Sequence, residues 1–335
     1  MDTLQISMGV IITLVIVALL FDFMNGFHDA ANSIATIVST RVLKPHHAVL
    51  WAACFNFLAY FLFELKVAGT IGKGTIDPSI VDHYIVFGAL IGAIVWNVVT
   101  WYYGIPSSSS HALVGGLVGA AVAKAGFGGL VASGVLKIIA FIFIAPFLGF
   151  MLGSFMMLIV SWLCRNMSPS KVDKHFRRLQ LLSAAAYSLG HGGNDAQKTI
   201  GIIWMLLISA GLSESTGHVP GWVVLSCYTA MGLGTMFGGW RIVKTMGNRI
   251  TKLNQARGFC ANSAGAMTLF FATALGVPVS TTHTITGAIA GVGTVRGARR
   301  VRWGVAGGIV WAWILTIPCS AIIAAAAWWA GKQFL

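Results

Sequence analysis

The sequence predicts an all-α polytopic membrane protein with an inverted-topology repeat. Its composition, its apolar stretches and its repeated motifs predict this fold class. Of the 335 residues, 57% are hydrophobic and only 9% are charged, whereas soluble proteins carry about 25% charged residues. The mean hydropathy of +0.81 indicates that lipid surrounds most of the chain. A spanning helix needs roughly 20 apolar residues, which leaves room for about 10–12 transmembrane segments.

The basic residues gather in short segments between the apolar stretches. The net charge is +13, and sixteen of the 22 lysines and arginines lie in segments 41–47, 165–178, 241–257 and 296–302. Basic loops between membrane spans stay in the cytoplasm, so these segments are predicted to be cytoplasmic, and nucleic-acid binding is not expected. The first span, from about residue 8 to residue 24, then runs inward. Both termini are predicted on the non-cytoplasmic side.

Two motifs each occur twice, which indicates a duplicated chain. Residues 25–32 (NGFHDAAN) match residues 191–198 (HGGNDAQK), with glycine, aspartate and alanine coinciding. Residues 104–111 (GIPSSSSH) match residues 276–283 (GVPVSTTH) in the same order. The loop charges give the two halves opposite topologies. The predicted parts are a first inverted repeat at 1–164, a basic cytoplasmic linker at 165–179 and a second inverted repeat at 180–335.

The repeated motifs are predicted to interrupt helices at membrane depth. Irregular backbone is tolerated there only where it lines a cavity, and secondary transporters place such breaks around a site between inverted repeats. Serine and threonine are good helix N-caps, so helices starting at Ser108 and Ser280 would aim free N–H groups at the cavity. Such helix starts attract anions. Segment 241–257 mixes basic and apolar residues, and an amphipathic interfacial helix is predicted there.

Asp29 and Asp195 are the most informative single residues. A carboxylate inside a membrane span is costly and usually functional. Carboxylates beside an anion site make sense if a cation accompanies the anion, either as a proton that they accept or as a metal ion that they bind. The alternative is that each aspartate only caps a helix start. The symmetric pair favours cation-coupled anion uptake.

These motifs resemble those of the inorganic phosphate transporter (Pit) family, closest to its bacterial low-affinity permeases, over nearly the whole chain. The resemblance implies a dimeric symporter of the bacterial inner membrane with two re-entrant Ser/Thr hairpins, no cofactor, and H⁺ or Na⁺ as the transported co-ion. By position, phosphate-binding hydroxyls are expected at Ser108, Ser109, Ser110, Ser280, Thr281 and Thr282. Cation or proton coupling, with further contact to the anion, is expected at Asp29, Asn32, Asn194 and Asp195.

One departure from the family pattern concerns the coupling ion. Sodium-coupled eukaryotic members carry glutamates where this chain has Asn56 and Asn262. This difference favours protons, or uptake of a neutral metal–phosphate complex, in which case Asp29 and Asp195 would hold the metal. Sulfate is the alternative substrate, because similar hydroxyl pockets would suit it.

Other polar residues of the motifs are predicted to be accessory. The histidines could carry protons or could simply hold the motifs in shape, and Lys198 could offset the carboxylates or attract the anion. The residues are Asn25, His28, His111, His191, Lys198 and His283. A membrane hydrolase that uses Ser110 and His111 is not expected, because the sequence has no Gly-x-Ser-x-Gly elbow. A passive channel or a sensor stays a further alternative.

Overall fold

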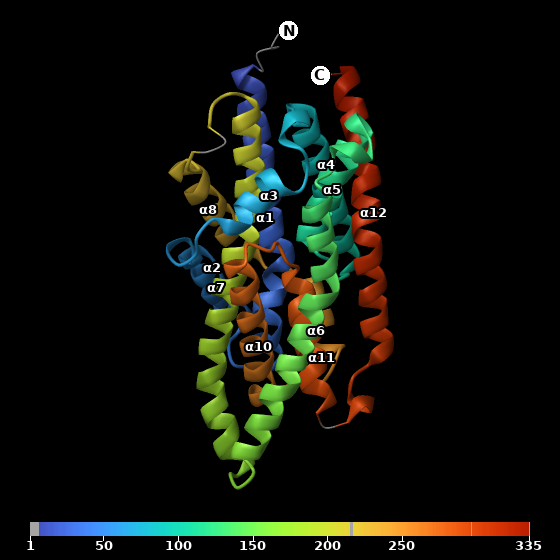
Figure 1. Ribbon diagram of the computed structural model, residues 1–335. Helices are drawn as coiled ribbons and strands as arrows, with labels where there is room; N and C mark the ends of the chain where they lie inside the picture. Colours follow the sequence, from blue (N-terminus) through green and yellow to red (C-terminus); the bar gives the residue numbers. More distant parts are fainter. Residues whose placement is uncertain (1–6, 215–216, 296, 335) are drawn as a thin grey trace.

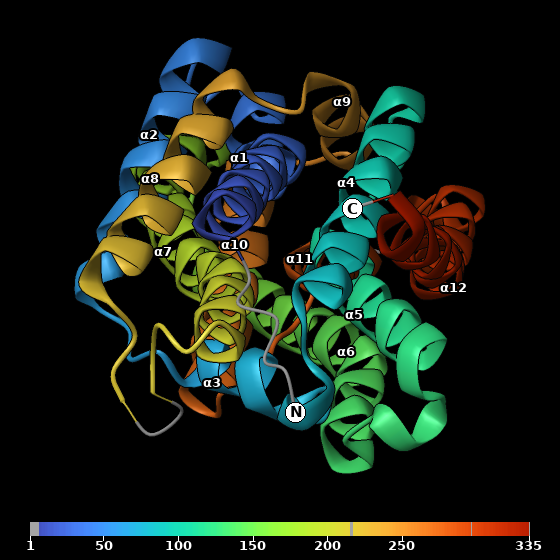
Figure 2. The ribbon, with the colours of Figure 1, turned by 90° about the horizontal axis from the view of Figure 1, so that it is seen from above.

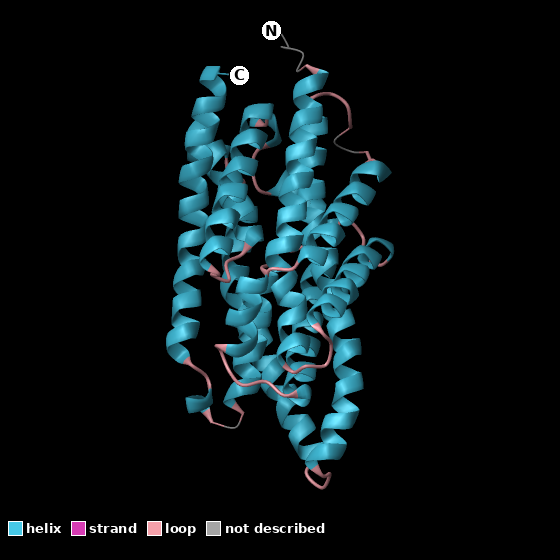
Figure 3. Ribbon diagram, turned by 180° about the vertical axis from the view of Figure 1, so that it is seen from behind, coloured by secondary structure: helices cyan, strands magenta, loops and turns pink. Residues whose placement is uncertain are grey.

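The structure is a computed structural model that describes residues 7–214, 217–295 and 297–334. Within these ranges the protein is all-helical, and the only β-type pairing is an isolated bridge between Ile76 and Leu130 (Figure 3). Arg296, in one predicted cytoplasmic segment, lies outside the described residues. The prediction of an all-α protein with several apolar spans is confirmed.

The α-helices follow one another along the described chain with short connections, some of which are single 3₁₀ turns. Their bounds are α1 Met8–Ser39, α2 Pro45–Leu58, α3 Lys66–Gly74, α4 His83–Tyr103, α5 Ser109–Ala125, α6 Ala132–Leu163, α7 Pro169–Ser209, α8 Gly221–Phe237, α9 Trp240–Asn248, α10 Gln255–Ala274, α11 Thr281–Thr294 and α12 Trp303–Phe334. The 3₁₀ turns are η1 Ala59–Phe61, η2 Pro78–Ile80, η3 Phe127–Gly129 and η4 Ala298–Arg300.

Some of these helices can each cross a membrane as a single span. Among the described residues, α1, α4, α6 and α12 are long and apolar enough, and a fifth span results if α2 with η1 is joined to α3 across a bend of 79°. The other helices are too short or too polar by the same measure. The helix α7, for example, is 41 residues long but carries many buried polar side chains in its middle.

The helices α1 to α6 correspond in order to α7 to α12, and some of the paired helices share their length or an internal proline. The short helices α3 and α9 have nine residues each, and the long helices α6 and α12 each contain an internal proline, Pro146 and Pro318. The first helices of the two halves, α1 and α7, run in opposite directions along the bundle (Figure 1). The start of α1 and the end of α12 lie at one end of the bundle (Figure 1).

The opposite end carries the basic loops. The connections 164–168 and 297–302 form its tip (Figure 1), and Arg177 reaches the carbonyl of Arg41 at 3.2 Å. Arg302 N–H donates to the carbonyl of Ile250 at 2.9 Å, which joins two further basic segments. We call this end of the bundle the basic end.

Each half packs one of its helices against a helix of the other half. Seen from above, α5 lies beside α12 and α11 lies beside α6 (Figure 2), and these two pairs are, with α7 and α10, the most extensive helix pairs among the described residues. Glycines make the close approach: a Cβ at Gly119 would lie 2.1 Å from the carbonyl oxygen of Ala321, and one at Gly291 would lie 2.2 Å from that of Phe150. Small residues allow helix backbones to approach closely in membrane proteins.

The predicted breaks at the Gly-x-Pro motifs are confirmed. The helices α4 and α10 end at Tyr103 and Ala274, and the next turns use Gly104 and Gly276 in left-handed conformations with φ of 66° and 65°. After a short extended stretch, α5 and α11 begin. Their N-caps are the two serines that the sequence predicted, Ser108 and Ser280, whose hydroxyls accept from the N–H groups three residues later.

The predicted breaks at the two aspartate motifs are wrong. Residues 25–32 lie inside α1 and residues 191–198 lie inside α7, and both helices are continuous there. In an apolar surrounding an unbroken helix satisfies every backbone polar group. The glycines serve close packing instead, since a Cβ at Gly26 would lie 2.2 Å from the Met231 carbonyl oxygen and one at Gly192 would lie 2.3 Å from that of Asn56.

One further expectation needs correction in its boundaries, and one predicted segment is largely helical. The predicted interfacial helix at 241–257 is divided, because α9 ends at Asn248 and a loop follows before the side chain of Asn254 caps α10. The basic segment 165–179 is mostly helix, because α7 begins at Pro169. Proline suits a first helical turn, where its missing N–H would have no partner.

Two hydrophobic cores lie one above the other along the bundle. The core nearer the termini includes Ile11 to Phe21 of α1 and Ala196 to Leu207 of α7. The core nearer the basic end includes Ala31 to Ile37 of α1 and Phe176 to Tyr187 of α7. The aspartate motifs of both helices therefore lie at the junction between the two cores.

Candidate functional site

The structure brings the two aspartate motifs together at this junction. The side chains of Asp29 and Asp195 are buried, and the ligand atoms of these two carboxylates and His191 all lie within 4.8 Å of one another. The starts of α5 and α11 reach the same place from the two extended segments. Residues from both halves thus form one cluster.

The start of α5 touches both aspartates. The hydroxyl of Ser109 donates to Asp29 at 3.3 Å and that of Ser110 donates to Asp195 at 3.4 Å, while Ser108 caps the helix through the N–H of His111. The first N–H groups of a helix have no intrahelical acceptor. The start of α5 therefore presents hydroxyls and N–H groups side by side.

The start of α11 makes the matching contacts. The hydroxyl of Thr281 donates to Asp195 at 3.1 Å and lies 3.5 Å from Asp29. The amide of Asn32 donates to the hydroxyls of Thr282, at 2.9 Å, and of Thr281, at 3.2 Å. Ser280 caps this helix as Ser108 caps α5. Asn32 therefore orients the hydroxyls of the opposite half.

Each aspartate has a histidine beside it. Nδ1 of His28 lies 2.6 Å from Asp29, and its Nε2 lies 3.1 Å from the hydroxyl of Thr100. Nε2 of His191 lies 3.3 Å from Asp195, and its Nδ1 lies 3.1 Å from Asn56. The histidine and asparagine positions are exchanged between the two motifs, yet the Asp–His pairing is kept in both.

Lys198 is the one described lysine that is fully buried. Its ammonium donates to Asp195, to the hydroxyl of Ser110 and to the carbonyl of Val279, the last at 2.7 Å. It takes the place that Asn32 has in the first motif, so the cluster is asymmetric. One carboxylate is paired with an ammonium and the other is not.

Asn194 braces the second extended segment. Its amide donates to the hydroxyl of Thr273 at 3.0 Å and to the carbonyl of Val277 at 3.1 Å, and its oxygen accepts from the N–H of Val279 at 3.1 Å. These contacts hold Val277 and Val279 of the extended segment against α7. The oxygen of Asn25, one turn before Asp29 on α1, is buried without a hydrogen-bond partner among the described residues.

The histidines that follow the two serine caps lie against each other. The ring centroids of His111 and His283 are 4.6 Å apart, and the ring of His283 stacks on Trp313 at 3.8 Å. Both histidines are buried, and their backbone N–H groups donate to the hydroxyls of the capping serines. Their contacts hold the two helix starts together.

The sequence analysis missed one buried carboxylate. Asp22 is completely buried in α1, its Oδ1 accepts from the hydroxyl of Thr199 at 2.9 Å, and its Oδ2 has no hydrogen-bond partner among the described residues. It interacts electrostatically with Asp195 and Lys198. A carboxylate inside the apolar stretch 8–24 was the signal that could have identified it.

Other polar residues near the cluster were also missed, and they act as braces. The hydroxyl of Tyr187 donates to the carbonyl of Thr281 at 3.0 Å. The side chain of Gln197 accepts from the N–H of Val67 at 2.9 Å and donates to the carbonyl of Glu64, which fixes the start of α3. Gln197 lies within the second aspartate motif, whereas no spacing in the sequence connects Tyr187 to the motifs.

The cluster is closed to bulk water, and it contains both groups that can bind an anion and groups that can bind a cation. Each sequence-predicted site residue is at most 3% exposed. Hydroxyls, the ammonium and helix-start N–H groups can bind an anion, whereas the carboxylates and imidazoles can bind protons or a metal ion. A buried polar cluster between two related halves of a membrane bundle is typical of a transport protein.

Comparison with known proteins identifies the family. The sequence profile described as "Phosphate transporter family" matches residues 25–171 and again residues 164–324. The chain therefore belongs to the phosphate transporter family, whose members are transporters and not enzymes, and it contains two copies of the family's repeat.

The relatives include named bacterial proteins. The "Probable low-affinity inorganic phosphate transporter" of Rhizobium meliloti is 59% identical over 97% of both chains. The protein of the same name from Bacillus subtilis is 47% identical over 95% of this chain and 96% of its own. A solved structure, "The sodium-dependent phosphate transporter", is similar with a TM-score of 0.89 and 27% identity, covering 98% of this chain and 100% of that one.

Proposed function

We propose that this protein carries inorganic phosphate across the bacterial inner membrane by cation-coupled symport, with the proton as the coupling ion. The names of its relatives support phosphate as the substrate. The composition of the central cluster supports a tetrahedral oxyanion accompanied by a cation. Sulfate is the alternative substrate, and competition decides between the two.

The anion would bind between the starts of α5 and α11. Hydroxyls from both halves point into the cluster, and helix starts add N–H groups and a favourable dipole. The ammonium of Lys198 already contacts Ser110, so a phosphate that meets these serines also meets a positive charge. The proposed phosphate contacts are Ser108, Ser109, Ser110, Ser280, Thr281, Thr282 and Lys198.

The proposal of cation coupling rests on the charges of the buried cluster. Asp22, Asp29 and Asp195 are buried carboxylates, and Lys198 is the one buried ammonium that interacts with them. With all three carboxylates ionised and the histidines neutral, these four groups would carry two negative charges before any anion enters. A phosphate would add at least one more in a low-dielectric interior, which is strongly unfavourable. Phosphate therefore requires accompanying cations.

The two Asp–His pairs favour protons as those cations. The imidazole and carboxylate of each pair lie 2.6 Å and 3.3 Å apart, close enough to pass a proton between them, and imidazole commonly carries protons in proteins. Asn56 and Asn262, which occupy the positions of family glutamates, are neutral and are hydrogen-bonded to His191 and Thr36. These amides favour protons over sodium, although a structural relative is named as sodium-dependent.

A metal–phosphate complex is the second candidate cargo. Asp29, His191 and Asp195 offer three ligand atoms within 4.8 Å of one another, and such nitrogen and oxygen donors suit a divalent metal. Lys198 opposes this reading, because its ammonium already pairs with Asp195. Uptake of a labelled divalent metal that depends on phosphate would favour this cargo.

The arrangement in the membrane is proposed as an inverted repeat of two halves, 1–164 and 180–335, joined by a cytoplasmic linker at 165–179. Short helices would complete the 10–12 segments, with α5 and α11 in two re-entrant hairpins. The positive-inside rule puts the basic end in the cytoplasm and both termini outside. A homodimer in lipid is proposed from the family resemblance, and cross-linking in membranes tests it.

The deciding experiment is uptake of labelled phosphate into proteoliposomes with an imposed proton or sodium gradient. Accumulation that follows the proton gradient and is not inhibited by excess sulfate supports proton–phosphate symport. Accumulation that requires sodium excludes the proton as the coupling ion, and strong inhibition by sulfate favours the alternative substrate. Flux that is independent of any gradient indicates a channel, and no flux at all contradicts transport.

The two central aspartates give the matching mutational test. Asp29→Asn and Asp195→Asn are each expected to abolish accumulation while the protein still inserts, because each removes a carboxylate from the coupling site. Glu64→Gln is the control, since Glu64 is an exposed carboxylate paired with Lys66 outside the cluster. Full accumulation by either aspartate variant would remove that residue from the coupling role.

A further inference from the structure

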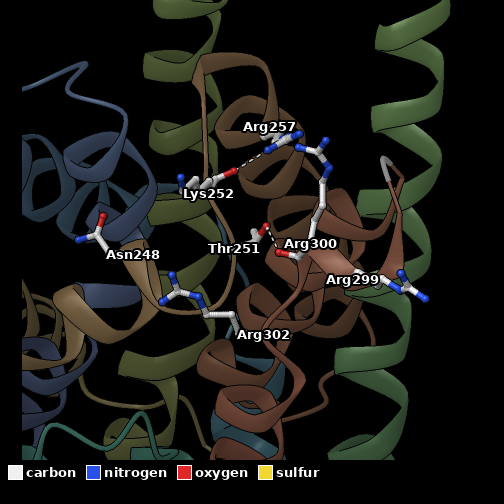
Figure 4. A pocket seen from close by; sticks show the side chains of 7 residues that line it. All are labelled: Asn248, Thr251, Lys252, Arg257, Arg299, Arg300 and Arg302. Atoms are coloured by element: carbon white, nitrogen blue, oxygen red, sulfur yellow. Dashed lines mark hydrogen bonds between the residues drawn. The ribbon is translucent and has the colours of Figure 1, made fainter.

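A positively charged cavity lies at the basic end, away from the central cluster. It has a volume of about 230 Å³ and lies between the loop that follows α9 and the loop that precedes α12 (Figure 4). This volume is several times the roughly 30 Å³ that one water molecule occupies in the liquid. Its lining residues are Asn248, Thr251, Lys252, Arg257, Arg299, Arg300 and Arg302.

The cavity is held by hydrogen bonds between the two loops. The hydroxyl of Thr251 donates to the carbonyl of Arg300 at 3.2 Å, and the N–H of Arg302 donates to the carbonyl of Ile250 at 2.9 Å. The guanidinium of Arg257 donates to the carbonyl of Lys252 at 2.6 Å (Figure 4). Arg257 is only 7% exposed and Thr251 only 3%. The lining is therefore part of the folded protein.

The charge of the lining is all of one sign. Five of its seven residues are lysine or arginine and none is acidic. In the described part of the chain, no carboxylate forms an ion pair with Lys252, Arg299, Arg300 or Arg302. The positive-inside rule explains basic residues in these loops. It does not explain why five basic residues line one cavity, because like charges in one place repel.

We propose that this cavity binds a phosphate group, either free phosphate or pyrophosphate or the headgroup of an anionic lipid. Arginine guanidinium groups recognise phosphate oxygens in pairs, and basic pockets near the cytoplasmic membrane surface bind anionic headgroups. The lining carries no carboxylate or histidine that could couple a cation. It is thus a binding site and not a second transport site, and it does not depend on the proposed function.

The test uses the purified full-length protein with two variants of equal charge. Arg299→Gln/Arg302→Gln removes two charges from the cavity, and Lys171→Gln/Lys174→Gln removes two exposed charges from α7 at the same end. One arm titrates inorganic phosphate and pyrophosphate in detergent by calorimetry. The other arm measures, by native mass spectrometry, how much cardiolipin and how much phosphatidylcholine each variant retains.

The cavity variant is expected to bind at least about tenfold more weakly than the control in one arm, because it lacks two of the charges that attract an anionic group. Loss in the titration arm identifies the free anion as the ligand, and selective loss of cardiolipin identifies the lipid. Equal binding by the two variants in both arms would overturn the proposal. The cavity variant should keep its thermal stability and phosphate uptake, so a loss of binding is not a loss of fold.

Discussion

Lys198 and Asp195 form a buried ion pair on the same face of α7, one turn apart. The same ammonium also contacts Ser110 of the other half and a backbone carbonyl of the second extended segment. Lys198 therefore connects the start of α5, the segment before α11 and a central carboxylate. This position lets it compensate one carboxylate and attract an anion at the same time.

Replacing Lys198 is expected to affect both stability and transport. Lys198→Met leaves Asp195 buried without its partner, and breaking a buried ion pair costs about 3–5 kcal/mol. Phosphate uptake is expected to fall at least about tenfold, because a hydrogen bond to a charged group contributes about 1.5–3 kcal/mol. Thermal unfolding in detergent and uptake into proteoliposomes measure the two effects.

The double variant Lys198→Met/Asp195→Asn separates them. It removes both charges, so most of the stability should return while uptake stays low. Lys124→Met, at a partly exposed pair with Asp82 outside the cluster, is the control and should change little. An unchanged unfolding temperature in Lys198→Met would show that the ion pair does not support the fold.

The packing of helices between the halves depends on glycines that the repeat conserves in position. Gly119→Ala would bring a Cβ to 2.1 Å from the carbonyl oxygen of Ala321, and such overpacking costs about 1–3 kcal/mol or more. A lower midpoint of thermal unfolding is expected. Gly307→Ala is the matched control, because nothing lies within 4 Å of its Cβ and alanine favours a helix over glycine by about 1 kcal/mol. Equal midpoints would contradict the packing argument.

Local signals in the sequence were sufficient for the class of protein and for the helix starts after Ser108 and Ser280. Low charge and long apolar stretches require lipid around the chain, and a serine after a Gly-x-Pro turn caps a helix wherever the turn lies. The same local reasoning failed at Gly26 and Gly192. A glycine costs a helix about 1 kcal/mol, and the surrounding membrane core and the packing of Met231 and Asn56 outweigh that cost.

The contacts within the cluster could not be predicted, because they depend on packing between distant segments. The sequence places Ser110 and Asp195 in two motifs, but nothing in their spacing brings one hydroxyl to one carboxylate. The packing of helices between the halves decides this contact. Asp22 stands in the sequence within an apolar stretch, but an average of hydropathy over that stretch does not reveal a single carboxylate. Asn194 matched a functional motif, and only its contacts distinguish bracing from coupling.

The contacts of Asn194 and Asn32 lead to different predictions for their alanine variants. Asn194→Ala removes the partners of the Val277 carbonyl and the Val279 N–H, and each unsatisfied buried group costs about 1–3 kcal/mol. The unfolding midpoint should fall, and the ion dependence of the remaining uptake should stay as in the wild type. Asn32→Ala removes only contacts to Thr281 and Thr282, so the phosphate KM should rise with a smaller change in stability. A changed coupling ion in Asn194→Ala would assign it to the coupling site instead.

Asp22 is the last residue for which the geometry makes a specific prediction. An ionised carboxylate that is fully buried with one oxygen lacking a partner among the described residues is costly to keep. A proton or another cation at Asp22 would remove that cost, and its interaction with Asp195 and Lys198 would connect this step to the central cluster. Asp22→Asn keeps the shape and should preserve folding.

The variant is therefore expected to exchange phosphate for phosphate at equal pH on both sides, but to lose most of the accumulation that an imposed proton gradient drives. Counterflow and gradient-driven uptake in the same proteoliposomes measure the two activities. Asp77→Asn, at a partly exposed carboxylate in the loop before α4 and outside the cluster, should behave as the wild type in both. If Asp22→Asn accumulates phosphate normally, the three-carboxylate account of coupling fails and the charge balance must rest on Asp29 and Asp195 alone.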